Sequence, residues 1–140
     1  MKRINLVAWL ALVLSAGLSI LVIFWSIQPF SPIITLETPI TIKNNPVQMG
    51  EDLVIEYRYC KNSNVDSGVV ARYIEGAGIY QLPEIRTNVA PGCKDIVVPI
   101  ELPRNLAPGE YTYNAEITYE VNPIKKTTYY FKSEPFNLER

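Results

Sequence analysis

The chain has 140 residues, which is enough for one domain and an anchoring segment. It contains no histidine, so the commonest general base and the commonest zinc ligand are both absent. Removing Lys2 and Arg3 from the 13 basic residues leaves 11 against the 14 acidic ones, a net charge of −3 that is spread along the chain. No basic patch with interleaved aromatic residues occurs, so nucleic acid is not an expected partner.

The N-terminal part carries a candidate membrane span. Residues 1–5 carry Lys2 and Arg3 and are the expected cytoplasmic N-terminus, and the 22 residues Leu6–Ile27 are apolar or small apart from three serines. As a helix this run is about 33 Å long, which exceeds the ~30 Å hydrocarbon core of a bilayer. Trp9 and Trp25 lie near its two ends, where indole rings favour the membrane–water interface. The lipid bilayer is therefore an expected partner.

The charge asymmetry around this span predicts its orientation. Lys2 and Arg3 precede it, and the next basic residue is Lys43. The positive-inside rule therefore predicts a cytoplasmic N-terminus and an extracytoplasmic C-terminal part. The short basic start and the lack of an Asn-x-Ser/Thr acceptor favour a bacterial inner membrane, with the C-terminal part facing the periplasm.

Two alternatives concern the span itself. The small residues at 15–17 could form a signal-peptidase site, but strongly apolar residues continue to Ile27, so an uncleaved signal anchor is the expectation. Ala11, Ser15 and Ser19 fall on one helix face at a spacing that permits close helix–helix contact in lipid. The alternative is that these small residues simply face lipid.

Residues 28–32 form a linker in which Pro29 and Pro32 end the helix and favour an extended chain. An extended linker gains ~3.1 Å per residue, so the following domain is expected to lie close to the membrane surface.

Residues 33–140 alternate strand-like runs with turn signals, without an amphipathic helical stretch. The clearest run is Tyr111–Val121, in which apolar and polar residues alternate over eleven positions, as in a half-buried strand. Seven short strands of this kind predict an all-β fold, a seven-stranded β-sandwich. The expected strands are 33–42, 52–60, 68–74, 79–85, 93–102, 111–121 and 127–136, and Pro39 suggests an edge position or a change of sheet within the first.

One local motif gives a family resemblance. The segment that contains Leu106, Pro108, Gly109 and Tyr111 resembles the tyrosine corner of immunoglobulin-like and fibronectin type III-like sandwiches. The resemblance covers Leu106 to Glu120 and implies that Tyr111 opens the sixth strand and bonds back to the preceding turn. It implies a fold rather than an activity.

The two cysteines are expected to form a disulfide. Cys60 ends the second expected strand and Cys93 begins the fifth, and these strands are antiparallel neighbours in an immunoglobulin-like topology. Both cysteines lie on the predicted extracytoplasmic side, where thiols oxidise. The alternative is two free buried thiols.

No residue set predicts catalysis, a cofactor or a metal centre, so the chain is not expected to be an enzyme. Serine hydrolysis lacks a histidine base, and two cysteines without histidine make a poor metal site. Glu51, Asp52 and Asp66 could assist calcium binding at a loop end, but no acidic loop repeat supports it.

Tyrosine is the residue type that suggests an interface. Tyr80 lies beside a glycine-rich tip, and Tyr129 and Tyr130 must point to opposite faces of a strand, so Tyr80 and Tyr130 are candidate interface residues. The alternative is scattered surface tyrosine. The sequence therefore favours a membrane-anchored interaction module that acts on another membrane or envelope protein as an accessory subunit or inhibitor. The alternative is a self-assembling structural component of an envelope or virion, and a small-ligand receptor or enzyme is less favoured.

Overall fold

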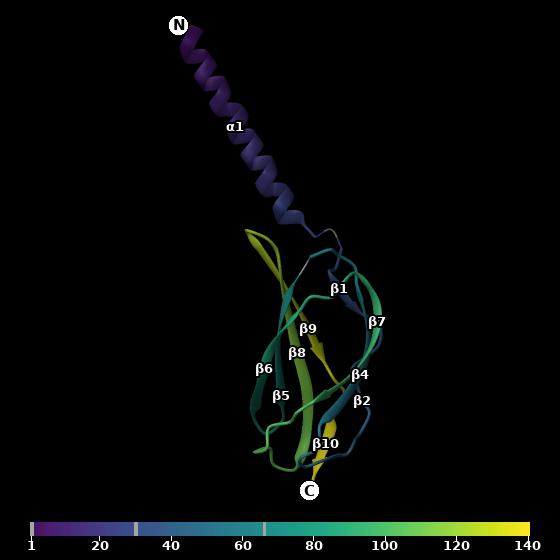
Figure 1. Ribbon diagram of the computed structural model, residues 1–140. Coiled ribbons are helices and arrows are strands. Elements are labelled where there is room, and N and C mark those ends of the chain that lie inside the picture. The colour runs from purple at the N-terminus through teal and green to yellow at the C-terminus, as the bar shows by residue number, and fades with distance from the viewer. Residues whose placement is uncertain (1, 30, 66) are drawn as a thin grey trace.

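The computed structural model describes residues 2–29, 31–65 and 67–140. A single helix, α1 (Lys2–Ile27), precedes a domain built of β-strands, and the two chain termini lie at opposite ends of the molecule (Figure 1). The stretch Leu6–Ile27 is long and apolar enough to cross a membrane, and almost all of its side chains are exposed. Four serine or glycine residues do not interrupt it, because long apolar side chains surround them and the serine hydroxyls bond within the helix.

The smaller sheet is centred on β4 (Leu53–Lys61). One edge of β4 pairs with β1 (Ile34–Leu36) and with β2 (Thr41–Ile42), and the other edge pairs with β7 (Gly92–Ile100), all antiparallel. The alternation predicted for β4 is confirmed, because Leu53, Ile55 and Tyr59 are buried and Arg58 is exposed.

The larger sheet is centred on β8 (Gly109–Asn122). One edge of β8 pairs with β5 (Gly68–Glu75), which in turn pairs with β6 (Ile79–Thr87). The other edge pairs first with β10 (Phe136–Glu139) and then with β9 (Lys125–Lys132), so both share one side of a long central strand. A two-residue strand, β3 (Val47–Gln48), adds to β10 in parallel, which makes this sheet mixed.

The strands therefore number ten among the described residues, whereas seven were expected. The expected strand 33–42 is divided into β1 and β2 around Pro39, and the expected strand 127–136 is divided into β9 and β10 before Phe136. In the first gap the chain changes partner, because Ile40 forms a parallel bridge with Ser133 of the other sheet. The short strand β3 was missed. The all-β domain and the single apolar helix are confirmed.

The main core lies between the two sheets. Its largest fully buried side chains come from both, and they are Leu53, Ile74, Val47 and Phe136. A second cluster fills the end nearest α1 and is formed by Ile33, Ile34, Tyr59 and Tyr119. At the far end, the glycine-rich tip has a packing role: a Cβ at Gly76 would lie 2.3 Å from the Tyr111 ring, so only glycine lets this ring approach.

Candidate functional site: the membrane-proximal junction

The linker after α1 is short and is held against the domain. Gln28 and Pro29 are half-buried, and together with Asn62 and Val121 they line a small crevice beside the sheet ends. Ile33, six residues beyond the helix end, is completely buried. Its N–H donates to the Tyr129 hydroxyl at 2.8 Å, and its carbonyl accepts from the Asn62 N–H at 2.8 Å. Phe30, within the expected linker, lies outside the described residues.

The turn between β8 and β9 contacts the C-terminal end of α1 directly. The Asn122 side-chain amide donates to the Trp25 carbonyl at 2.9 Å, and the Lys125 ammonium donates to the Ser26 carbonyl at 2.8 Å. The last carbonyls of a helix have no partner within it, and a cation there also interacts favourably with the helix dipole, by about 0.3–1 kcal/mol at exposed positions. The β8–β9 turn therefore caps α1 and holds the domain on it.

A buried lysine lies in the second cluster, beneath this junction. Lys61 is only 4% exposed, and its ammonium donates to the Val89 carbonyl at 2.6 Å. The same ammonium lies 5.8 Å from the centre of the Tyr119 ring, within the range of a cation–π interaction. Lys61 thereby ties the loop between β6 and β7 to the interior. Lys61 was not among the residues predicted from the sequence, although it continues the inward period-two series of β4 after Tyr57 and Tyr59.

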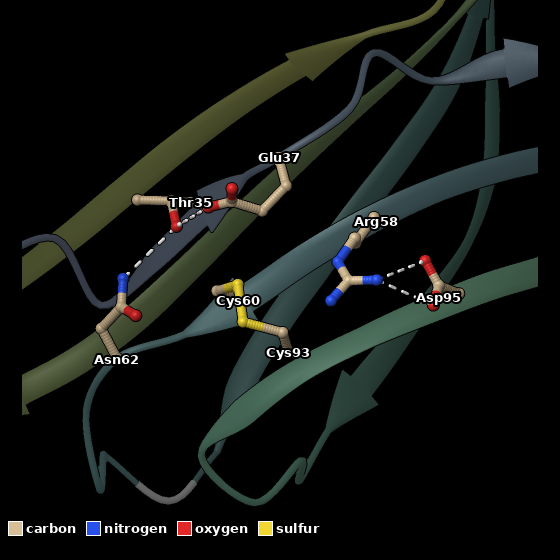
Figure 2. Close-up of a disulfide and its surroundings, with 7 residues drawn as sticks. All are labelled: Thr35, Glu37, Arg58, Cys60, Asn62, Cys93 and Asp95. Carbon is tan, nitrogen blue, oxygen red and sulfur yellow. Dashed lines mark hydrogen bonds and ion pairs between the residues drawn. A yellow bond between two sulfur atoms is a disulfide. The ribbon is translucent and has the colours of Figure 1, made fainter.

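Cys60 and Cys93 lie directly opposite each other on β4 and β7 and form a disulfide (Figure 2), so the predicted pairing is confirmed. The bond lies on the outer face of the smaller sheet. Polar contacts surround it: the Arg58 guanidinium is 3.2 Å from an Asp95 carboxylate oxygen, and the Asn62 amide is 3.3 Å from the Thr35 hydroxyl. The disulfide thus joins β4 and β7 directly beside the exposed Arg58–Asp95 ion pair of the same two strands.

The two candidate interface tyrosines do not share a face. Tyr130 is 71% exposed on the outer face of the larger sheet. Tyr80 is half-buried, and its ring packs edge-on against that of Tyr111 at a centroid distance of 6.3 Å. In the strand registers Tyr80 lies opposite Ile74, which is buried in the main core, so the side chain turns inward. The structure therefore does not bring Tyr80 and Tyr130 together in one interface.

The residues of α1 predicted to contact the membrane interface or another helix lie along a helix that the β domain does not cover. Trp9 is 67% exposed, whereas Trp25 is half-buried beside the β8–β9 turn. Ser15 and Ser19 donate their hydroxyls to carbonyls one turn back, each at 2.9 Å, and so they already have partners within the helix. Ala11 is exposed on the same face.

The turn before β8 is fixed by Tyr111. Its hydroxyl donates to the Ala107 carbonyl at 2.7 Å, and Leu106, which begins this turn, is 3% exposed. Pro108 and Gly109 lie between these residues and are exposed.

Burial raises the pKa of the Tyr111 hydroxyl. Two residues along β8, burial raises the pKa of Tyr113 to about 12, although the nearby Arg72 guanidinium acts in the opposite direction. These phenols are neutral structural groups near pH 7.

An open cleft lies between the free edges of β6 and β7. It measures about 430 Å³ and is lined by residues of both sheets and of the loop after β7, including Leu82, Ile100 and Arg104. Arg72 reaches it from β5, but its guanidinium donates to the Pro83 carbonyl at 2.8 and 3.2 Å. The arginine therefore links β5 to β6 within the larger sheet, where the register of the two strands shifts.

The candidate calcium ligands do not form a defined site. Glu51 and Asp52 are exposed in the turn before β4, and Glu51 accepts from the Gln48 N–H. Asp66 lies outside the described residues. Among residues 2–29, 31–65 and 67–140, no group of three His, Cys, Asp or Glu side chains gathers closely enough to hold a metal ion.

Compared with protein-family models and with curated protein sequences, the chain matches none of them.

Proposed function

We propose that this chain is a single-pass membrane protein whose β domain is an immunoglobulin-like sandwich outside the cytoplasm and binds a neighbouring membrane or envelope protein. If β1 with β2 and β9 with β10 each count as one strand and the two-residue β3 is left out, seven strands remain: the first, second and fifth form one sheet and the others form the second. The immunoglobulin constant-type arrangement differs only in placing the fourth strand with the first sheet. The hydrogen bond from Tyr111 to Ala107 is the bond of a tyrosine corner, which also supports this fold.

The location rests on two features of the chain. Lys2 and Arg3 precede the apolar helix and no other basic residue occurs before Lys43, which favours a cytoplasmic N-terminus. The disulfide lies in the part that then faces outward, where oxidising conditions maintain such bonds.

Binding rather than catalysis is supported by the arrangement of the charged groups. Four carboxylates on the outer sheet faces form ion pairs with cations on neighbouring strands or turns, and these pairs are Glu56–Lys43, Asp95–Arg58, Glu120–Lys126 and Glu75–Lys132. Each pair is exposed, as in a solvated surface, instead of converging on a cavity where their pKa values could be tuned for proton transfer.

The observation that carries the proposal is the rigid mounting of the domain. The buried Ile33, the half-buried Gln28 and Pro29, and the hydrogen bonds of Asn122 and Lys125 set the height and orientation of the domain relative to α1. A fixed height serves recognition of something at a constant distance from the membrane. It offers no advantage to a domain that searches a wide volume on a flexible tether.

The test is chemical crosslinking in intact membranes, followed by purification through a tag on the full-length chain. The informative variant carries a flexible six-residue Gly-Ser insertion between Pro32 and Ile33, whose end-to-end length as a random coil is about 12–15 Å. The matched control carries the same six residues after Arg140, which is exposed at the far end. We expect one partner in near-stoichiometric amount with the unmodified chain and the control, and a severalfold loss with the linker insertion.

Equal recovery of the partner by both insertion variants would show that the mounting is irrelevant to binding. Recovery of the chain itself alone would favour the self-assembling structural role over the interaction module. A Tyr130→Ala variant then tests whether the outer face of the larger sheet is the contact surface.

A further inference from the structure

The tip of the β8–β9 hairpin, residues 122–126, reaches the level at which the apolar part of α1 ends (Figure 1). The two carbonyls that it caps belong to Trp25 and Ser26, and the apolar run ends one residue later at Ile27. In a chain whose Leu6–Ile27 segment fills a bilayer core of ~30 Å, these carbonyls lie at the boundary between hydrocarbon and headgroups. Side chains bonded to them must lie at this boundary too.

The composition of the tip suits that position. Ile124 is 55% exposed, and the neighbouring Pro123 is also exposed, so the turn presents apolar surface that no part of the domain covers. Lys125 and Lys126 follow directly: the Lys125 ammonium donates to the Ser26 carbonyl and the Lys126 ammonium pairs with Glu120, so both cations lie beside the level that lipid headgroups would occupy. Other isoleucines of the domain, such as Ile79, are exposed too, so what distinguishes this turn is its position beside the end of the apolar helix.

We infer that the β8–β9 tip is a second membrane contact, in which Ile124 enters the headgroup region of the bilayer that holds α1. The contact is continuous with the hydrogen-bonded junction, because Asn122 and Lys125 flank Pro123 and Ile124 and fix their height. The occupant of the exposed apolar surface is therefore lipid. The inference rests on the proposed membrane anchor, and it adds that the domain touches the membrane at two places, which restricts its tilt.

The test measures membrane depth with a fluorescent label. The full-length chain is reconstituted in liposomes with one introduced cysteine carrying an environment-sensitive nitrobenzoxadiazole label, while Cys60 and Cys93 remain paired in the disulfide. The informative variant is Ile124→Cys. The matched control is Ile79→Cys, which is 66% exposed at the opposite end of the larger sheet. The anchor control is Leu14→Cys, which is 72% exposed near the middle of α1.

Spin-labelled lipids are expected to quench most of the emission at positions 14 and 124 and to leave position 79 unaffected, and the emission at 124 is expected to be blue-shifted relative to 79. Quenching at 14 without quenching at 124 would overturn the hairpin contact while leaving the anchor intact. Absence of quenching at 14 would overturn the anchor and the proposed function with it.

A second variant tests the role of the hydrogen bonds. With Asn122→Ala and Lys125→Ala added to the Ile124→Cys chain, quenching at position 124 is expected to fall toward that at position 79. Unchanged quenching would contradict the step that assigns the height of the tip to its bonds with α1.

Discussion

Removing the disulfide is the perturbation whose effect can be derived most directly from the structure. Cys60 and Cys93 are separated by 33 positions and close a loop that contains β5 and β6. In the chain-entropy model, a crosslink over such a loop lowers the entropy of the unfolded chain and stabilises the fold by about 3–4 kcal/mol. Replacing both cysteines by alanine removes two sulfur atoms: Cys93 is exposed, whereas Cys60 is buried, so the packing lost at Cys60 adds to the effect of the crosslink.

The expected change in melting temperature follows from the size of the domain. Residues 33–140 unfold with an entropy of ~2.1 cal/mol/K per residue, so a loss of about 3–4 kcal/mol lowers the melting temperature by about 15 °C. The assay is thermal unfolding of the full-length chain in detergent, followed by circular dichroism of the β-sheet signal. The α1 helix contributes a separate signal that does not depend on the disulfide.

The control is the same measurement with a reductant. The unmodified chain with reductant is expected to melt near the temperature of the double alanine variant, and the variant is expected to be insensitive to reductant. A melting temperature of the variant within a few degrees of the unmodified chain would refute the calculation. Two reactive thiols in the unreduced, denatured chain would refute the pairing itself.

Two further predictions concern buried phenols. Tyr111→Phe leaves the Ala107 carbonyl without its partner and is expected to cost about 1–2 kcal/mol in urea unfolding, whereas Tyr130→Phe, at an exposed position, should change stability by less than about 0.5 kcal/mol. Burial raises the pKa of Tyr113 from 10.0 to about 12 in the folded chain, so Tyr113 loses its proton at a lower pH in the unfolded state than in the folded state. The stability that this pKa shift contributes is complete below pH 10 and is lost as the pH rises toward 12. The stability lost in this way amounts to about 2–3 kcal/mol. Between pH 10 and 12 the urea midpoint of Tyr113→Phe should therefore decline less than that of the unmodified chain. Equal declines in the two proteins would contradict the raised pKa of Tyr113.

The parts of the fold that could be predicted from sequence are those determined by local alternation. In β8, the inward series Tyr111, Tyr113, Ala115 and Tyr119 is buried, because each second side chain of this strand faces the same core. The short strand β3 has no such pattern. Val47 and Gln48 form a strand only because β10 offers them a free edge, and that partner lies about ninety residues away in the chain.

The same distinction applies to the candidate site residues. The cysteine pair could be inferred because both residues lie at ends of strands that neighbour each other in the expected topology. The glycine-rich tip beside Tyr80 makes this residue a candidate for an interface, but the direction of its side chain is set by its register opposite Ile74. Gly76 belongs to a turn that the Tyr111 ring covers, and nothing in the local sequence specifies that contact.

At the junction with α1, a small error in the expected strand lengths hides the contact between the β8–β9 turn and the helix. The expected strands ended at Val121 and resumed at Thr127, whereas β8 runs to Asn122 and β9 begins at Lys125. The added residues are those that bond to Trp25 and Ser26, across sequence separations of 97 and 99 positions.

The Asn-Pro turn was recognisable from its residue types, but turn chemistry specifies only that the chain reverses. The height at which it reverses depends on how far the hairpin extends beyond the sheet, and here that extension brings the hairpin tip to the end of the helix. The length of β8 therefore sets how the domain is mounted on α1. Shortening the hairpin by one residue pair should break the contact between the β8–β9 turn and α1 without unfolding the domain or the helix.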